Sequence, residues 1–316
     1  MYEWRRQVQK IVDDIDRCII NRDDDGLTLR VIARENGYSG FHMTRKFKEL
    51  SGISLRDYLR GRRLAFALID LRDTGKSILD IAVDYGFSSH AAFCRSFKAV
   101  YGIPPSTYRA KPKPVALRTR LITFDRYFLG LGEIGMEKST SDIKTYFVSI
   151  PAHKFLHVKN DESDGYFDFW ERQDQIPGMD CGTICGLLDS LKGKLDGEDG
   201  VIGKFSGQIM ARICENGKAP EAYGVRLPAD YTGDIPSQML LITVPEAEYL
   251  VFEHGGFDYE QECETAAEKL RAAMDSFDYG GTGYSPDPSP GRLSYFYFDP
   301  EKYVKRVVPV KRRGPG

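Results

Sequence analysis

Two arginines occupy matched positions in two copies of one short pattern. Arg45 lies in GYSGFHMTRKFKELSGISLRDYLR, which begins at Gly37, and Arg95 lies in GFSSHAAFCRSFKAVYGIPPSTYR, which begins at Gly86. A guanidinium on an exposed helix can donate two hydrogen bonds to O6 and N7 of guanine in the major groove of DNA. A single arginine of this kind is commonly an ordinary solvated side chain. Its recurrence in two matched motifs favours DNA binding.

Each copy predicts a helix-turn-helix, in which a tight glycine turn joins a first helix to a second. The first helices are expected over residues 29–35 and 78–85, and Ser39 and Ser88 are expected to cap the second helices. Matched residues lie 49 positions apart early in the motif and 50 apart later. One residue is therefore inserted within the second copy.

The helical period of 3.6 residues predicts which side of each second helix packs inward. The inward set is Met43, Phe47 and Leu50 in the first copy, and Phe93, Phe97 and Val100 in the second. The outward lysines are expected to hold phosphates, which orient a protein on DNA without reading its sequence. The complete set of expected DNA contacts is Phe41, Thr44, Arg45, Lys48, His90, Ala91, Cys94, Arg95 and Lys98.

A leucine-rich segment connects the two motifs. SLRDYLRGRRLAFALIDLRDTG predicts one helix of about 18 residues, hence about 27 Å long. A strut of this length suits the ~34 Å that separates successive major-groove faces. Gly61 within it is expected to cost roughly 1 kcal/mol relative to alanine.

The region from Ile11 to Arg109 resembles the AraC/XylS family of bacterial transcription regulators, in the arrangement of its MarA and Rob-like members. The likeness is carried by GYS, the F-K pair, SG-I-S, Tyr58, IAVDYGFSS, RSFK and GIPPSTYR. It implies seven helices, with two sets of base-reading positions: Phe41, Thr44 and Arg45, then His90, Ala91, Cys94 and Arg95. This chain has phenylalanine where those relatives usually have tryptophan. It has alanine and cysteine where polar base-contacting residues are common. The DNA sequence that those relatives recognise is therefore not expected to be its operator.

Charge is divided unevenly along the 316 residues. Residues 1–140 hold 25 Lys and Arg against 17 Asp and Glu, whereas residues 141–316 hold 19 against 29. The basic first part favours contact with a polyanion, and the acidic second part suits a neutral or cationic ligand. Solubility is the simpler explanation for the acidic part. The length allows two domains, each with its own core.

Several classes of protein are excluded or disfavoured. No apolar run approaches the ~20 residues of a membrane span and no signal-peptide core is present, so a cytoplasmic protein is expected. Six cysteines without CxxC spacing predict reduced thiols, with Cys181 and Cys185 as a less favoured redox pair. His153 and His157 fall in a predicted strand rather than on one helix face. No metal, cofactor or catalytic residue is predicted, and motifs such as GxSxG are absent from the sequence.

The second part of the chain follows a different period. Pro112 and Pro114 predict a linker over residues 111–141. From residue 142 to 314, TYFVSIPAHKFLHVK and MLLITVPEAEYLVFEH alternate as strands do and align with each other at an offset of 94. With the helices and strands expected after each, they predict an α+β domain of two β-α-β-β repeats, behind an all-α domain over residues 1–110. A ligand site is expected where the two repeats meet.

Residues from about Asp142 to Arg312 resemble the GyrI-like effector-binding domain of SHS2 type. The likeness is carried by IPA, VPEAEYLVFEHGGFDYE, Trp170 and the VVPVK strand. It implies a small-molecule effector, aromatic or cationic, held by aromatic walls around a glutamate. Ser294 stands where that glutamate is expected, which puts the preference for cations in question. The candidate ligand-binding residues are Trp170, Glu171, Tyr223, Tyr249, Glu253, Tyr295 and Tyr297.

These observations predict a sequence-specific DNA-binding transcription regulator that is controlled by an effector and acts with RNA polymerase, as a monomer or homodimer. Two alternatives stay open. In one, the second domain is a small-molecule hydrolase with Glu171 and Glu253 as acid and base. In the other, it is a ligand-free architectural domain that contacts polymerase or another regulator. The sequence leaves the operator, the effector and the direction of control open.

Overall fold

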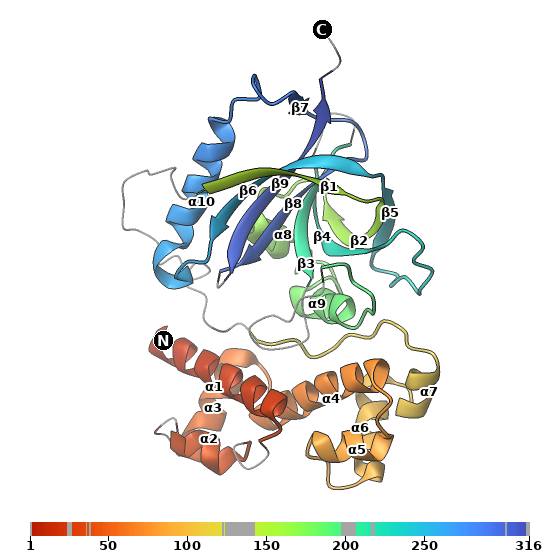
Figure 1. Ribbon diagram of the computed structural model, residues 1–316. Coiled ribbons are helices and arrows are strands. Elements are labelled where there is room, and N and C mark those ends of the chain that lie inside the picture. The colour runs from red at the N-terminus through yellow and green to blue at the C-terminus, as the bar shows by residue number, and fades with distance from the viewer. Residues whose placement is uncertain are drawn as a thin grey trace. The chain divides into compact units, whose positions relative to one another are not determined.

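The chain forms two compact units. A computed structural model describes residues 2–23, 27–35, 37, 39–121, 123, 143–196, 207–215, 219–300 and 302–313. Unit 1 contains Met1–Leu129, Gly182–Lys192 and Glu198–Ser206, and unit 2 contains Gly130–Cys181, Gly193–Gly197 and Gly207–Gly316 (Figure 1). Within the described residues, no helix combines the length and the apolar character needed to cross a bilayer.

Unit 1 is helical, as the sequence predicts. Helices α2 and α3 pack with α1 near one end of α4, and α5, α6 and α7 lie near its other end (Figure 1). The connecting helix α4 has 19 residues, which confirms the expected strut. The described helices of this unit are α1 (Tyr2–Asn21), α2 (Leu29–Glu35), α3 (Gly40–Ser51), α4 (Leu55–Asp73), α5 (Ile78–Asp84), α6 (His90–Tyr101), α7 (Pro105–Ala110) and α9 (Cys181–Asp189).

One hydrophobic core runs through unit 1. Met43 and Phe47 of α3 and Phe93 and Phe97 of α6 are fully buried, as the helical period predicts. Val100 is 46% exposed, so its expected place among the inward residues is wrong. Phe97 and Tyr101, four residues apart, both pack into this core, and Val100 between them lies on the outer side of the helix.

Helix α9 is an unexpected member of unit 1, because glycines on both sides of Cys181 indicate a loop-rich stretch in the sequence. Arg72 of α4 donates a hydrogen bond to the carbonyl oxygen of Ser190 (2.6 Å), and the Val115 amide donates to the Ser190 hydroxyl (3.0 Å). A Cβ atom at Gly186 would lie 2.4 Å from the carbonyl oxygen of Leu117. The glycine therefore permits contact between the helix and the extended chain that follows α7.

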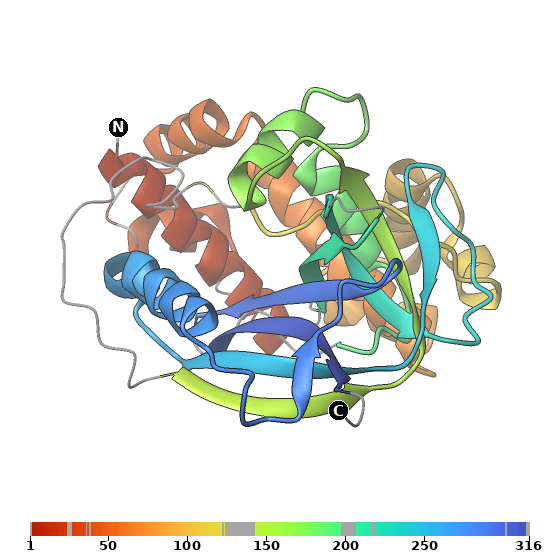
Figure 2. The same cartoon turned by 90° about the horizontal axis from the view of Figure 1, so that it is seen from above.

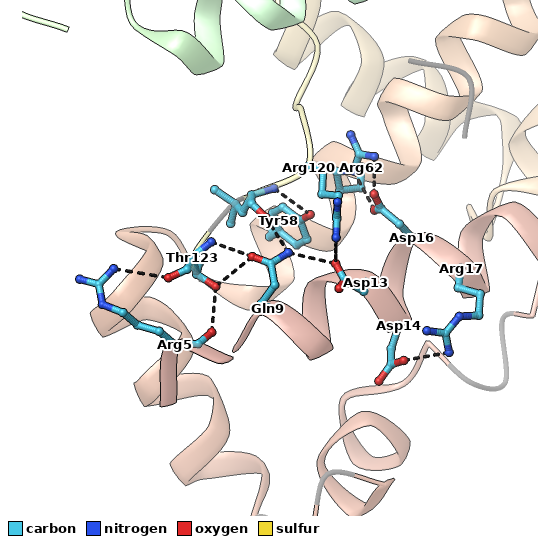
Figure 3. A network of polar contacts seen from close by, with 11 residues as sticks. Arg5, Gln9, Asp13, Asp14, Asp16, Arg17, Tyr58, Arg62, Arg120 and Thr123 are labelled. Carbon is cyan, nitrogen blue, oxygen red and sulfur yellow. Dashed lines mark hydrogen bonds and ion pairs between the residues drawn. The ribbon is translucent and has the colours of Figure 1, made fainter. Parts of the chain in front are cut away.

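A polar network fixes that extended chain on α1 and α4 (Figure 3). Buried Arg62 of α4 pairs with buried Asp16 of α1 (Nε to Oδ1, 2.8 Å) and also donates to the carbonyl oxygen of Arg118. Farther along, Arg120 bonds to Asp13 (Nε to Oδ1, 2.9 Å). The described part of the expected linker, up to residue 123, thus packs within unit 1.

Unit 2 is built on an antiparallel sheet of nine strands in the described residues. The elements are β1 (Ile143–Ile150), β2 (His153–Asn160), α8 (Tyr166–Gln173), β3 (Gln208–Ile213), β4 (Glu221–Pro228), β5 (Leu240–Val244), β6 (Ala247–Gly255), α10 (Tyr259–Asp275), β7 (Tyr284–Pro286), β8 (Leu293–Asp299) and β9 (Tyr303–Arg312). Pro151 separates the first two strands, because proline cannot donate to a strand ladder.

The strand order is symmetric. It reads β1-β6-β9-β8-β3-β4-β2-β5, with β7 paired to β9. If β1 is exchanged with β5, β2 with β6, β3 with β8 and β4 with β9, the result is the same series of strands read from its other end. The centre of this symmetry lies between β3 and β8, whose pairing includes Met210 with Phe296.

The two faces of the sheet differ. One face, called here the helix face, carries Leu250 and Phe252 against Ala266 and Leu270 of α10. Figure 2 shows α10 along one side of these strands. The opposite face carries a separate core that includes Phe155, Tyr249, Val251, Tyr295 and Val307. Because neighbours along a strand point to opposite faces, the register assigns every strand residue to one face or the other.

Candidate DNA-binding surface and effector site

The second helices of the two motifs have the same caps. Ser39 accepts a hydrogen bond from the His42 amide at the start of α3, and Gly52 ends that helix with a φ of 75°. Gly102 ends α6 with a φ of 76°. The N-cap of α6 is Ser89, which accepts from the Ala92 amide, so the expectation of Ser88 is wrong. Ser39 and Ser89 are 50 positions apart, which places the inserted residue in the turn before the helix.

The expected DNA contacts lie on the outer side of both helices. Phe41 is 79% exposed, an unusual position for a large apolar side chain. Thr44 is half-buried, and its hydroxyl donates to the carbonyl oxygen of Gly40 (2.8 Å). In α6, the half-buried Cys94 thiol lies 3.6 Å from Nε2 of exposed His90. The remaining exposed members are Arg45, Lys48, Ala91, Arg95 and Lys98.

The four basic side chains of this surface differ from most other arginines of unit 1. Among the described residues, no side-chain hydrogen bond or ion pair is formed by Arg45 and Lys48 of α3, or by Arg95 and Lys98 at the matching positions of α6. By contrast, Arg62 and the arginines at positions 60, 72, 109 and 120 bond to carboxylates or carbonyl oxygens. Unpaired cations on two matched helices suit an external polyanion.

The seven candidate ligand residues do not lie together. Tyr223 is on the helix face, where its ring centroid lies 4.9 Å from that of Trp170 on α8. Tyr249, Tyr295 and Tyr297 belong to the opposite face, and their rings lie in sequence 6.0 Å and 6.3 Å apart. The sheet separates the two groups, so the expectation of one site lined by all seven is wrong.

The proposed acid and base of a hydrolase are also separated. Glu171 is exposed on α8, over the helix face. Glu253 is on the opposite face, where it pairs with Lys305 (3.2 Å) and accepts a hydrogen bond from Tyr146 (2.6 Å). Burial opposes these contacts, yet they lower the pKa of Glu253. Two carboxyl groups on different faces cannot act on one bond, so this acid and base pair is contradicted.

Polar side chains within the opposite face form a connected group that the sequence did not indicate. His153 Nδ1 donates to the Pro151 carbonyl oxygen (2.8 Å), and the Tyr295 hydroxyl donates to Nε2 (2.6 Å). Arg226 bonds to Asp196 (Nε to Oδ2, 2.6 Å) and lies over the Tyr295 ring. Because Nδ1 donates to a carbonyl oxygen, the neutral form of His153 carries its proton there, and Nε2 then accepts from the Tyr295 hydroxyl.

This neutral histidine predicts a pH dependence of stability. Burial lowers the pKa of His153 below its ordinary value of about 6.5, with Arg226 acting in the same direction. As pH falls below about 6.5, His153 takes up a proton more readily in the unfolded chain than in the folded one. The contribution of His153 to the free energy of unfolding is therefore full above that pH and is lost as pH falls further. We expect the urea midpoint, followed through Trp170 in a Trp4→Phe background, to fall between about pH 7.5 and about pH 5.5.

The variant His153→Gln should reduce this fall of the urea midpoint. We assign the remaining fall to His157, because burial lowers the pKa of His157 as well. His254→Gln, near the C-terminal end of β6, serves as the control, and its effect on the profile should be smaller than that of His153→Gln. Equal pH profiles for the parent protein and His153→Gln would contradict the assignment.

A cavity of about 460 Å³ lies between β1, β6 and α10. Lys144, His254, Glu262 and Lys269 are among its lining residues, and none of the seven candidate ligand residues lines it. Among the described residues, no group of three or more His, Cys, Asp or Glu is placed to hold a metal ion.

The paired, identically capped helices with outward cations define a helix-turn-helix DNA-binding domain. Residues 32–111 match the family described as "Helix-turn-helix domain". The chain is 39% identical over 101 residues to the regulatory protein SoxS of Escherichia coli, covering 32% of this chain and 94% of SoxS. The chain belongs, through this domain, to the AraC/XylS family of DNA-binding transcription regulators.

Two further similarities extend beyond that domain. The right origin-binding protein of Escherichia coli is 40% identical over 137 residues, which cover 43% of this chain and 40% of that protein. A solved structure of SAV2435 bound to tetraphenylphosphonium is 15% identical, covers 53% of this chain and 94% of its own, and has a TM-score of 0.35.

Proposed function

We propose that this regulator reads DNA with α3 and α6 and that a small-molecule effector bound by unit 2 controls it, as a GyrI-like domain would. The proposal that α3 and α6 bind DNA is supported by the unpaired basic side chains on these two identically capped helices. Phe41 on α3 suits apolar contact with a thymine methyl group, and Arg45 and Arg95 suit guanine. We assign contacts with phosphate groups to Lys48 and Lys98. RNA polymerase is the expected protein partner.

Selection from random duplexes, followed by footprinting, tests the sequence-specific function. A protein that inserts two helices into adjacent major-groove turns should protect a site of about 20 base pairs. Failure to enrich any sequence, with only weak and salt-sensitive binding, would instead support an architectural protein.

Substitutions on α3 separate base reading from phosphate contact. Arg45→Ala should weaken binding to the selected site by about 1 to 3 kcal/mol and relax the preference at a few bases. Lys48→Ala should weaken all sequences nearly alike and reduce the salt dependence by about one counterion. Arg17→Ala, an exposed arginine of α1, is the control and should change neither. Competition binding to matched and mutated duplexes measures both effects, and equal behaviour of the two variants on α3 would contradict the assignment.

The effector part of the proposal is tested on the full chain by thermal shift with a panel of small molecules. A ligand at 100 times its dissociation constant adds about 2.7 kcal/mol to the free energy of unfolding. Ligand-dependent change in affinity for the selected duplex would then establish control. Turnover of a compound without any change in DNA binding would favour an enzyme.

A further inference from the structure

A row of side chains crosses the helix face of the sheet. Register places its members directly opposite one another on neighbouring strands, and such partners share a face. The row is Phe252, Arg306, Phe296, Met210, Tyr223 and Val158. At one end Phe252 lies against Phe277, just beyond α10 (ring centroids 5.4 Å apart). At the other end Tyr223 lies against Trp170 of α8.

The middle of this row lies between the two helices. We call Arg306, Phe296 and Met210, with Ser294 and Arg212 of the adjacent row, the interhelical strip. Arg306 is exposed and Phe296 is half-buried, so the strip is open to small molecules at its centre. The strip also contains the symmetry centre of the sheet, between β3 and β8.

The carboxylate nearest the strip is already engaged. Arg212 bonds to Glu221 (3.0 Å) and to Asp164 (3.1 Å). Glu221 is buried and also accepts hydrogen bonds from the Gly165 amide (2.8 Å) and the Ser163 hydroxyl (3.1 Å). Its negative charge is therefore balanced by Arg212 and by two hydrogen-bond donors outside the strip.

Arg306 is the arginine of the strip that has no carboxylate partner among the described residues. Its guanidinium carbon lies 3.9 Å from the centroid of the Phe296 ring, and among the described residues it has no hydrogen bond or ion pair. Although the Arg306 side chain is exposed, partial loss of hydration beside the surrounding protein lowers its pKa to about 10, and Arg212 and Arg271 add repulsion that Glu221 only partly offsets. The guanidinium is charged at neutral pH. An anion beside it would relieve both the lost hydration and the repulsion.

The neighbouring groups suit an aromatic molecule. Phe296 and Met210 form an apolar floor, and Tyr223 and Trp170 continue it toward α8. The indole Nε1 of Trp170 is buried, and it has no hydrogen-bond partner among the described residues. A planar ring can pack on this floor while a carboxylate takes two parallel hydrogen bonds from a guanidinium.

We propose that the interhelical strip binds a small aromatic carboxylate, with Arg306 as the partner of its negative charge. This inference rests on the proposed effector function of unit 2 and names the chemical class of the effector. It differs from the cationic ligand that the resemblance implies. Ser294 stands at the expected glutamate position, and its partner across the strands is Arg212.

Three probes that share one ring system test the charge preference. We expect 2-naphthoate to bind the full-length protein at least about 10-fold more tightly than neutral 2-naphthamide, and 2-naphthylmethylammonium to bind weakest, in isothermal titration calorimetry. Equal or tighter binding of the amide or the ammonium, or no binding of the naphthoate, would overturn the inference.

Substitutions test the location. Arg306→Gln should weaken 2-naphthoate at least about 10-fold and leave 2-naphthamide nearly unchanged, and Arg306→Glu should reverse the charge preference. Lys311→Gln removes one cation from the same strand on the opposite face and should have no effect on 2-naphthoate. Equal losses from Arg306→Gln and Lys311→Gln would refute the site. Affinity for the selected duplex serves as the check on folding.

The outcomes separate this inference from the proposed function. Binding of tetraphenylphosphonium in place of 2-naphthoate, with altered DNA affinity, would refute the anion preference and leave effector control standing. Failure to enrich any duplex would refute the regulator itself, whatever the naphthyl probes show.

Discussion

Asp16→Ala should lower the free energy of unfolding of unit 1 by about 3 to 5 kcal/mol. Both Asp16 and Arg62 are fully buried, and two hydrogen bonds join them across α1 and α4 (Figure 3). Removing the carboxylate takes away the group that pairs with the Arg62 charge in the core, while the carbonyl oxygen of Arg118 still accepts a hydrogen bond from it. An uncompensated buried charge is among the most costly defects that a single substitution produces.

The measurement uses the two tryptophans of the chain, Trp4 in unit 1 and Trp170 in unit 2. In a Trp170→Phe background, urea unfolding followed by fluorescence reports unit 1 alone. Asp14→Ala is the matched control on the same helix, because Asp14 pairs with the exposed side chains of Lys10 and Arg17. It should cost at most about 1 kcal/mol. Equal losses for the two variants would show that the buried pair is dispensable.

A double variant separates the charge from the packing. Replacing the pair together, as Asp16→Leu with Arg62→Met, should recover most of the stability lost in Asp16→Ala, because no unpaired charge remains. A double variant as unstable as the single one would assign the loss to the shape of the site instead.

Gly186→Val should destabilise unit 1 by about 3 kcal/mol, near the upper end of the range for overpacking. A Cβ atom at this position would lie 2.4 Å from the carbonyl oxygen and 2.8 Å from the amide nitrogen of Leu117. Both contacts are with backbone, so no side chain can rotate away, and either α9 or the extended chain must move. The hydrogen bonds that hold Ser190 to Arg72 and Val115 should weaken as a result.

The same tryptophan assay measures this loss, and hydrogen exchange of the Val115 amide locates it. Gly182→Val on the exposed side of α9 is the control, and it should change stability by less than about 1 kcal/mol. Protection of the Val115 amide in Gly186→Val equal to that of the parent protein would contradict the close approach of the helix.

The helical domain could be predicted from sequence because its signals are local. Leucine spacing predicts α4, and Ser39 and Gly52 mark the ends of α3. The error at Ser89 arose because the inserted residue could be placed on either side of the cap. Val100 has the spacing of an inward residue, but Tyr101 takes the inward position in that turn instead.

Residues of the candidate effector site were less predictable because their contacts are with partners distant in sequence. Alternation predicts β9 as a strand, but only the register shows that Arg306 lies beside Phe296 and near Arg212. Aromatic residues and glutamates were chosen by type, and the sheet then divides them between its two faces. Helix α9 was missed because its glycines disfavour a helix locally, whereas packing against Leu117 requires one of them.

Helix α9 has a consequence for how such regulators can be recombined. The stretch between β2 and β3 leaves unit 2 after Cys181, contributes Gly182–Lys192 to unit 1, and returns at Gly193. A gene truncated or fused at a single junction after residue 123 therefore produces a DNA reader that lacks one of its own helices. Exchange of unit 2 between relatives built in this way must leave α9 with the helical unit, which takes a second crossover within the segment that encodes unit 2.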